Sequence, residues 1–226
     1  MGNKKLAIAV AVTGLFMAAS FIRAIGATRS KVPPVSAAVS LQRLLDGNRR
    51  FSTGKMEHPR QTTARRDEVA QGQYPFAAVL ACSDSRTAPE IVFDQGLGDL
   101  FVVRVAGNVA DHLVIESLDY AVTHLNARLV VVMGHTHCGA IKAAVEGHDE
   151  PDEDVGPMLR ELRPAVDAAK SLPGDVFDNA SKENVRLIVK DLSKEGPLAP
   201  MIQSGELKIV GAMYDIDTGK VTLLDK

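Results

Sequence analysis

The sequence predicts an α/β fold: a mainly parallel central β-sheet with flanking helices, an N-terminal helical arm and an antiparallel C-terminal strand. Short apolar runs alternate with stretches of helical periodicity, which is typical of a parallel sheet covered by helices on both faces. A turn sequence, Asp217-Thr218-Gly219-Lys220, then separates the last two apolar runs. This turn predicts that the final strand pairs back on the strand before it.

The predicted elements follow one another in a simple order. The helical arm covers residues 41–51, with Ser40 as its expected N-cap, and a second short helix covers residues 62–71. Buried strands are predicted at residues 76–81, 100–105, 129–133 and 207–213, with the antiparallel strand at 221–224. Helices between them are predicted at residues 114–125, 140–146 and 184–192, and an exposed acidic loop at 149–154.

The N-terminus has the pattern of an export signal. Lys4 and Lys5 precede an uncharged apolar run that ends at Ile22, and small residues follow up to Ala27. The run is short for a bilayer span, which needs ~20 apolar residues, so a cleaved leader is favoured over a membrane anchor. We therefore expect a signal peptide or anchor over residues 1–27, a linker over 28–39 and a single domain over 40–226. The location expected is the bacterial periplasm or the exterior, with membrane attachment if the leader is not cleaved.

Composition argues against nucleic acid as a partner. The 226 residues carry a formal net charge of −2, contain no Trp and are only 4% aromatic. A nucleic-acid-binding surface needs a basic patch, and a single-strand binder also needs aromatic stacking platforms.

The two cysteines suggest a metal site. Cys82 follows the first predicted strand, and Cys138 follows the third, three residues after His135. Ligands of an open parallel sheet bind beyond the carboxyl ends of its strands. Two thiolates and one imidazole would hold zinc and leave a fourth position for water or a carboxylate. Cys138 also precedes a predicted helix, whose N-terminus favours the thiolate form.

The residues leave alternatives open. A Cys82–Cys138 disulfide is common chemistry in exported proteins, and the thiols could instead be inert and buried, or a redox pair. Asp84 and Arg86 follow Cys82 closely. Arg86 would either hold Asp84 away from the fourth metal position or form an ordinary surface salt bridge. His137 is expected to point away from the site.

Two motifs contain the candidate ligands: Cys82-Ser83-Asp84-Ser85-Arg86 and Gly134-His135-Thr136-His137-Cys138-Gly139. They resemble the signature pair of the β-class carbonic anhydrases, and residues 44–51, 93–108 and 211–215 extend the likeness over residues 41–224. The resemblance implies one zinc ion per chain on Cys82, His135 and Cys138, with Asp84 and Arg86 as a catalytic dyad. Asp84 would be a fourth ligand in a closed state. The implied reaction is reversible hydration of carbon dioxide to bicarbonate and a proton by zinc-bound hydroxide.

The resemblance is to the plant-like branch of the family. It implies that Gln73 hydrogen-bonds substrate and that Phe101 and Tyr120 line the active site, usually from the partner subunit of a homodimer or homotetramer. His124 is either a proton shuttle or a surface histidine. A non-catalytic bicarbonate site that uses a tryptophan is not expected, because the chain has none. Two alternatives share the same zinc site: a hydrolase of carbon disulfide or carbonyl sulfide, and a zinc-binding homologue without catalysis.

Overall fold

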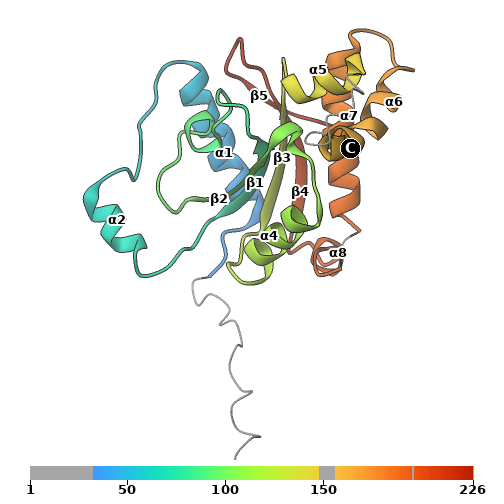
Figure 1. Cartoon of the computed structure of the whole chain (residues 1–226). Coiled ribbons are helices and arrows are strands. Elements are labelled where there is room, and N and C mark those ends of the chain that lie inside the picture. Colours follow the sequence, from blue (N-terminus) through green and yellow to red (C-terminus); the bar gives the residue numbers. More distant parts are fainter. Residues whose placement is uncertain (1–32, 148–155, 195, 226) are drawn as a thin grey trace, which may run out of the picture.

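A computed structural model describes residues 33–147, 156–194 and 196–225 of the chain. Its centre is a five-stranded sheet in the order β2-β1-β3-β4-β5 (Figure 1). The first four strands in this order are parallel to their neighbours, and β5 runs antiparallel to β4. The predicted fold class is therefore confirmed. The strands are β1 Ala77–Cys82, β2 Leu100–Val105, β3 Leu129–His135, β4 Lys208–Tyr214 and β5 Val221–Leu223.

Helices cover both faces of the sheet, so its central strands are buried throughout. Alternate side chains of each strand point to opposite faces. Leu80 and Val132 pack toward α4 (His112–Thr123), α7 (Val176–Leu192) and α8 (Leu198–Gln203). On the other face, Val79 and Val131 pack toward α1 (Ala37–Ser52) and α3 (Pro89–Val92). This double burial explains why these strands are continuous apolar runs rather than alternating patterns.

The N-terminal helix starts earlier than predicted. Ser36, not Ser40, is its N-cap and accepts a hydrogen bond from the Val39 amide. Ser40 lies buried inside α1, where its hydroxyl donates to the Phe76 carbonyl oxygen at 2.9 Å. A serine at the start of an apolar pattern favours an N-cap, but here a long-range partner holds it inside the helix. The last three residues of the predicted linker therefore belong to α1.

The remaining helices differ in how far local sequence predicted them. The short helix predicted over residues 62–71 is α2 (Thr63–Val69), with Thr62 as its N-cap, and Figure 1 shows this helix away from the sheet. On the opposite side α5 (Gly139–Glu146), α6 (Gly156–Ala169) and α7 lie together. α6 was not predicted, and it contains Pro164, which normally counts against a helix. α7 begins at Val176 rather than at residue 184, because Asp175 provides an N-cap two turns earlier.

Two predicted segments lie outside the described residues: the leader at 1–27 and the acidic stretch at 149–154. In the part of the chain that the structure describes, a helix both long enough and apolar enough to span a bilayer was not found.

Candidate metal centre

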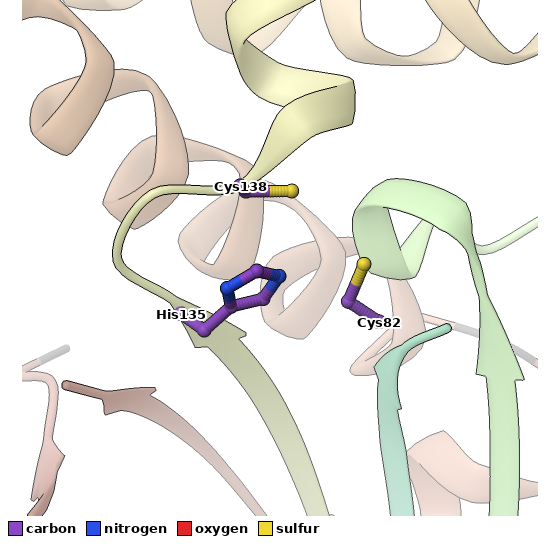
Figure 2. Close-up of side chains that lie close together, drawn as sticks. All are labelled: Cys82, His135 and Cys138. Atoms are coloured by element: carbon purple, nitrogen blue, oxygen red, sulfur yellow. The ribbon is translucent and has the colours of Figure 1, made fainter. Parts of the chain in front are cut away.

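Cys82, His135 and Cys138 converge at the carboxyl edge of the sheet. Cys82 is the last residue of β1, His135 the last of β3, and Cys138 the N-cap of α5. Because β1 and β3 are parallel neighbours, both end at this edge. One ligand atom from each of the three residues lies within 4.8 Å of the other two. Figure 2 shows the three side chains directed toward a common space, and all three are buried.

The imidazole of His135 is oriented for metal binding. Its Nδ1 lies 2.8 Å from the Thr136 carbonyl oxygen, so Nδ1 carries the proton and donates it. Its Nε2 is buried and has no hydrogen-bond partner among the described residues. A buried ring nitrogen without a partner is costly unless something else binds its lone pair. A metal ion bound between Nε2 and the two sulfurs would satisfy it.

The two cysteines are free, so the disulfide alternative does not hold in this structure. A hydrogen bond from the Cys138 thiol is the main cause that lowers the pKa of Cys82, against the effect of burial, and the Asp84 and Gly107 amides lower it further. The pKa of Cys138 is raised, first because its thiol is hydrogen-bonded to Cys82, then by burial and by the Cys82 charge. The α5 amides act on Cys138 in the expected direction but are outweighed. Without a metal, the pair therefore shares one proton, which metal binding would displace.

The donor set fits zinc. Two thiolates and one imidazole leave one position of a tetrahedral site open, as in zinc enzymes rather than in closed structural sites. Thiolate ligands select against magnesium and calcium, which prefer oxygen donors.

Asp84 is held by Arg86 beside this cluster. The Arg86 Nε donates to Asp84 Oδ1 at 2.9 Å and its Nη2 to Oδ2 at 2.8 Å, and the Arg86 amide adds a bond of 3.0 Å to Oδ1. The bond from the Arg86 side chain is the main reason that the pKa of Asp84 lies far below its usual range. Asp84 is therefore an ionised carboxylate with both oxygens engaged by one guanidinium. This is the arrangement in which Asp84 is kept away from a fourth metal position.

Two neighbouring residues form hydrogen bonds to the backbone of Cys82 and Asp84. Neither of them was identified from the sequence. Arg104 donates through Nε to the Cys82 carbonyl at 2.9 Å and through Nη2 to the Asp84 carbonyl. The buried Thr87 hydroxyl contacts the same two carbonyl oxygens at 3.2 and 3.0 Å. Arg104 had one sequence signal, since it is the only charged residue in the apolar run of β2.

The loop between His135 and Cys138 is tied to the β4–β5 turn. Thr136 donates its amide to the Tyr214 carbonyl and accepts from the Ile216 amide through Oγ1, both at 3.0 Å. His137 points out of the cluster, as expected, and its Nε2 lies 3.0 Å from Asp217 Oδ2. The His137 carbonyl accepts a 3.2 Å bond from Arg86. The turn therefore supports both the ligand loop and the arginine of the dyad.

The other predicted site residues lie away from the cluster. Gln73 precedes the first residue of β1, whereas Cys82 is its last, and a six-residue strand spans about 20 Å. Phe101 is at the second position of β2, where its ring lies 6.2 Å from that of Tyr120. The Tyr120 ring stacks on His124 at 5.0 Å. A single chain thus groups Phe101, Tyr120 and His124 together but does not bring them, or Gln73, to the metal ligands.

Comparison with known proteins gives a consistent result. The family model for carbonic anhydrase matches residues 77–221. Carbonic anhydrase 2 of Mycobacterium tuberculosis is 38% identical over 198 residues, which are 86% of this chain and 96% of the relative. The structure of the β-carbonic anhydrase CcaA has a TM-score of 0.66 at 30% identity, covering 82% of this chain and 95% of that one.

A tetrameric β-carbonic anhydrase from Sordaria macrospora has the same fold, with a TM-score of 0.65 at 23% identity and coverage of 84% of this chain and 95% of its own. The metal cluster, its supporting carboxylate and these likenesses agree. This chain belongs to the β-carbonic anhydrase family.

Proposed function

We propose that this protein uses one zinc ion per chain to catalyse the reversible hydration of carbon dioxide to bicarbonate and a proton. The observation that carries the proposal is the Cys82–His135–Cys138 cluster beside an arginine-bound carboxylate, in a chain of the carbonic anhydrase family. Zinc would bind to the two sulfurs and to Nε2 of His135.

The site residues have separate tasks in this reaction. A bound zinc ion lowers the pKa of a coordinated water to about 7 and so supplies a nucleophile near neutral pH. Asp84 orients the attacking oxygen by accepting a hydrogen bond from it, because an ionised carboxylate can only accept. Arg86 holds Asp84 in that orientation through two side-chain bonds. Orientation of a small nucleophile toward the substrate carbon is itself a large part of such rate enhancements.

The test is stopped-flow hydration of carbon dioxide by the zinc-loaded protein, with zinc content measured on the same sample. We expect rapid hydration and about one zinc per chain. Cys138→Ala should lose both the metal and the activity, and a full zinc complement in this variant would contradict the ligand role. Parallel assays with carbonyl sulfide and carbon disulfide separate hydration from hydrolysis. The comparisons do not favour that hydrolase alternative, nor a homologue without catalysis.

We further propose that a second copy of the chain completes the active site. The support is positional: Gln73, Phe101 and Tyr120 lie far from the metal ligands of their own chain. All residues of the edge strand β2 are only partly buried, and Tyr74 and Tyr120 are 53% and 44% exposed. Aromatic side chains exposed beside an open strand edge suit burial against another subunit. The family relative from Sordaria macrospora is tetrameric.

We also propose that the protein is exported by its N-terminal leader. The support is the sequence pattern of residues 1–27. In an oxidising compartment the two thiols must bind zinc before they oxidise to a disulfide. Mass spectrometry of the mature N-terminus after expression with the leader tests this proposal, since an anchor would leave residues 1–27 in place.

A further inference from the structure

The sulfur of Cys82 has a hydrogen-bond donor of its own in the protein. The Gly107 amide donates to Cys82 Sγ at 3.3 Å, and both groups are buried. Gly107 belongs to the short 3-10 turn η1 (Ala106–Asn108) that follows β2. In Figure 2 the green strand β2 continues into this turn beside the Cys82 sulfur. An N–H bond to a thiolate withdraws charge from the sulfur and so changes the ligand that the metal meets.

The backbone of Gly107 has a conformation that the rest of the turn must support. Its φ of 66° lies in the left-handed region, and so does the φ of 44° of the next residue, Asn108. A Cβ at this position would lie 3.0 Å from Leu162 Cδ1 and 3.3 Å from Ala140 Cβ. Leu162 of α6 and Ala140 of α5 would therefore have to shift by a few tenths of an ångström to admit a side chain at position 107. Contact alone, however, does not orient the peptide groups of Gly107.

Asn184 supplies the orienting bond. Its Nδ2 donates to the Gly107 carbonyl at 2.8 Å across a separation of 77 residues. Asn184 is only 4% exposed and lies in the middle of α7. Asparagine is a poor residue for a helix interior, and a buried carboxamide is costly without partners. The hydrogen bond to the Gly107 carbonyl offsets the cost of burying the Asn184 carboxamide in the helix.

We propose that Asn184 is a positioning residue that acts on the metal centre through Gly107. By fixing the Gly107 carbonyl, it holds the left-handed turn in which the Gly107 amide points at the Cys82 sulfur. The bond makes that sulfur a weaker electron donor, and the apolar side chains packed around Cys82 and Cys138 strengthen its effect. The inference rests on the proposed metal binding by Cys82, and it adds the residue that adjusts one of the three ligands.

The main test compares Asn184→Leu with Ser181→Ala. Leucine has a similar volume but cannot donate. Ser181 is the matched control, because it is also buried on α7 but donates only to the Phe177 carbonyl of its own helix. Each protein is loaded with cobalt(II), and the sulfur-to-metal charge-transfer band is recorded. We expect the band of Asn184→Leu to move to longer wavelength, because the Cys82 sulfur loses the N–H bond and becomes a stronger electron donor. The band of Ser181→Ala should stay at the wild-type position.

A second measurement does not depend on the variant folding. In the wild-type protein loaded with 113Cd, a scalar coupling between the metal and the Gly107 amide proton reports the N–H···S bond directly. We expect this coupling in the wild type and in Ser181→Ala, and its loss in Asn184→Leu or, if that variant is unfolded, in Asn184→Ser.

The outcomes separate this inference from the proposed function. Absence of the coupling in folded wild type, or an unchanged band and coupling in a folded Asn184 variant, would overturn the role of Asn184. An equal band shift in Ser181→Ala would also overturn it, because general loosening of α7 would then explain both. If the wild-type protein binds neither zinc nor cobalt, the proposed function itself fails.

Discussion

Asp84 is the residue on which the proposed chemistry depends most. Three bonds from Arg86 orient its carboxylate, and Arg104 and Thr87 hold the backbone on which it sits. These bonds determine both where the carboxylate lies and that it is ionised. A change at Asp84 should therefore affect turnover while leaving the three metal ligands in place.

We predict that Asp84→Asn keeps its zinc but loses carbon dioxide hydration by about 10²-fold or more. The amide replaces one acceptor oxygen with a donor, so Arg86 can no longer bind both positions. Stopped-flow rates and metal analysis on the same preparation measure the two effects. Asp225→Asn, an exposed carboxyl near the C-terminus, is the control and should be fully active. Wild-type turnover in Asp84→Asn would rule out a catalytic role.

The β4–β5 hairpin is the element that supports the ligand loop. Asn48 of α1 fixes the hairpin by donating to the Gly219 carbonyl at 2.9 Å and accepting from the Val221 amide at 2.8 Å. The hairpin in turn bonds Thr136, which lies between two metal ligands. A strand pair at the far end of the sequence thus holds the geometry of the loop at residues 135–138.

Thr136→Val should weaken the hold on zinc. Valine has the same shape but leaves the Ile216 amide without its acceptor, at a cost of about 1–3 kcal/mol. We expect zinc to be lost to a chelator ~10-fold faster. Thr136→Ser keeps the hydroxyl and should behave like wild type. If the valine and serine variants lose zinc at the same rate, the Thr136–Ile216 bond does not support the site.

Asp94, which holds the segment around residues 57–60, is expected to make the stability of the fold depend on pH. Asp94 is buried and accepts from the Glu57 and His58 amides, each at 3.0 Å, and from Arg50 at 2.6 Å. Burial raises the pKa of Asp94, but these hydrogen bonds outweigh it and the pKa is lowered. A lowered pKa in the folded state stabilises the protein above the ordinary carboxyl value of about 3.9.

We therefore predict that the free energy of unfolding falls as pH drops below about 4, because protonation of Asp94 releases this loop. Denaturant unfolding between pH 3 and 7 measures the effect. The Asp94→Asn variant should be less stable than the wild type at neutral pH. Its free energy of unfolding should also change less with pH in the acid range. An unchanged slope would show that Asp94 does not contribute to acid unfolding.

At the scale of the whole molecule, the described residues contain the Cys82–His135–Cys138 cluster, which could hold a metal ion, and an open sheet edge at β2. Sequence order places Gln73 only nine residues before Cys82, yet the strand between them carries the two to opposite edges of the sheet. Within one chain, therefore, Gln73 does not lie beside the metal ligands. Two copies that meet at their β2 edges could bring Gln73, Phe101 and Tyr120 toward the metal ligands of the partner.

Dilution tests this arrangement. We expect specific activity to fall in parallel with dissociation to monomer, because the monomer would keep its zinc but lack the substrate-binding residues. Sedimentation velocity and stopped-flow activity over the same concentration series provide the comparison. Gln73→Ala is expected to lower activity without changing the oligomer. A monomer as active as the assembly would contradict a shared site.

Residue types and their spacing were sufficient to predict the strands, the fold class, the three clustered ligand candidates and the Asp84–Arg86 contact. Each of these depends on short segments: an apolar run that ends at a cysteine, or an aspartate two residues before an arginine. Parallel strands then bring their carboxyl ends to one edge of the sheet, independently of how the other segments fold. The start of α1 and the existence of α6 were missed, since local signals competed with long-range packing there.

Only the tertiary structure determined how the site is supported and how its protons are shared. The roles of Arg104, Thr136 and Asn184 depend on partners from other elements, up to 80 residues away, and nothing in their local sequence identifies those partners. The proton shared by Cys82 and Cys138 likewise depends on the distance between two sulfurs 56 residues apart in sequence, because interacting thiols titrate as a pair. Contacts of this kind exist only once the chain has folded.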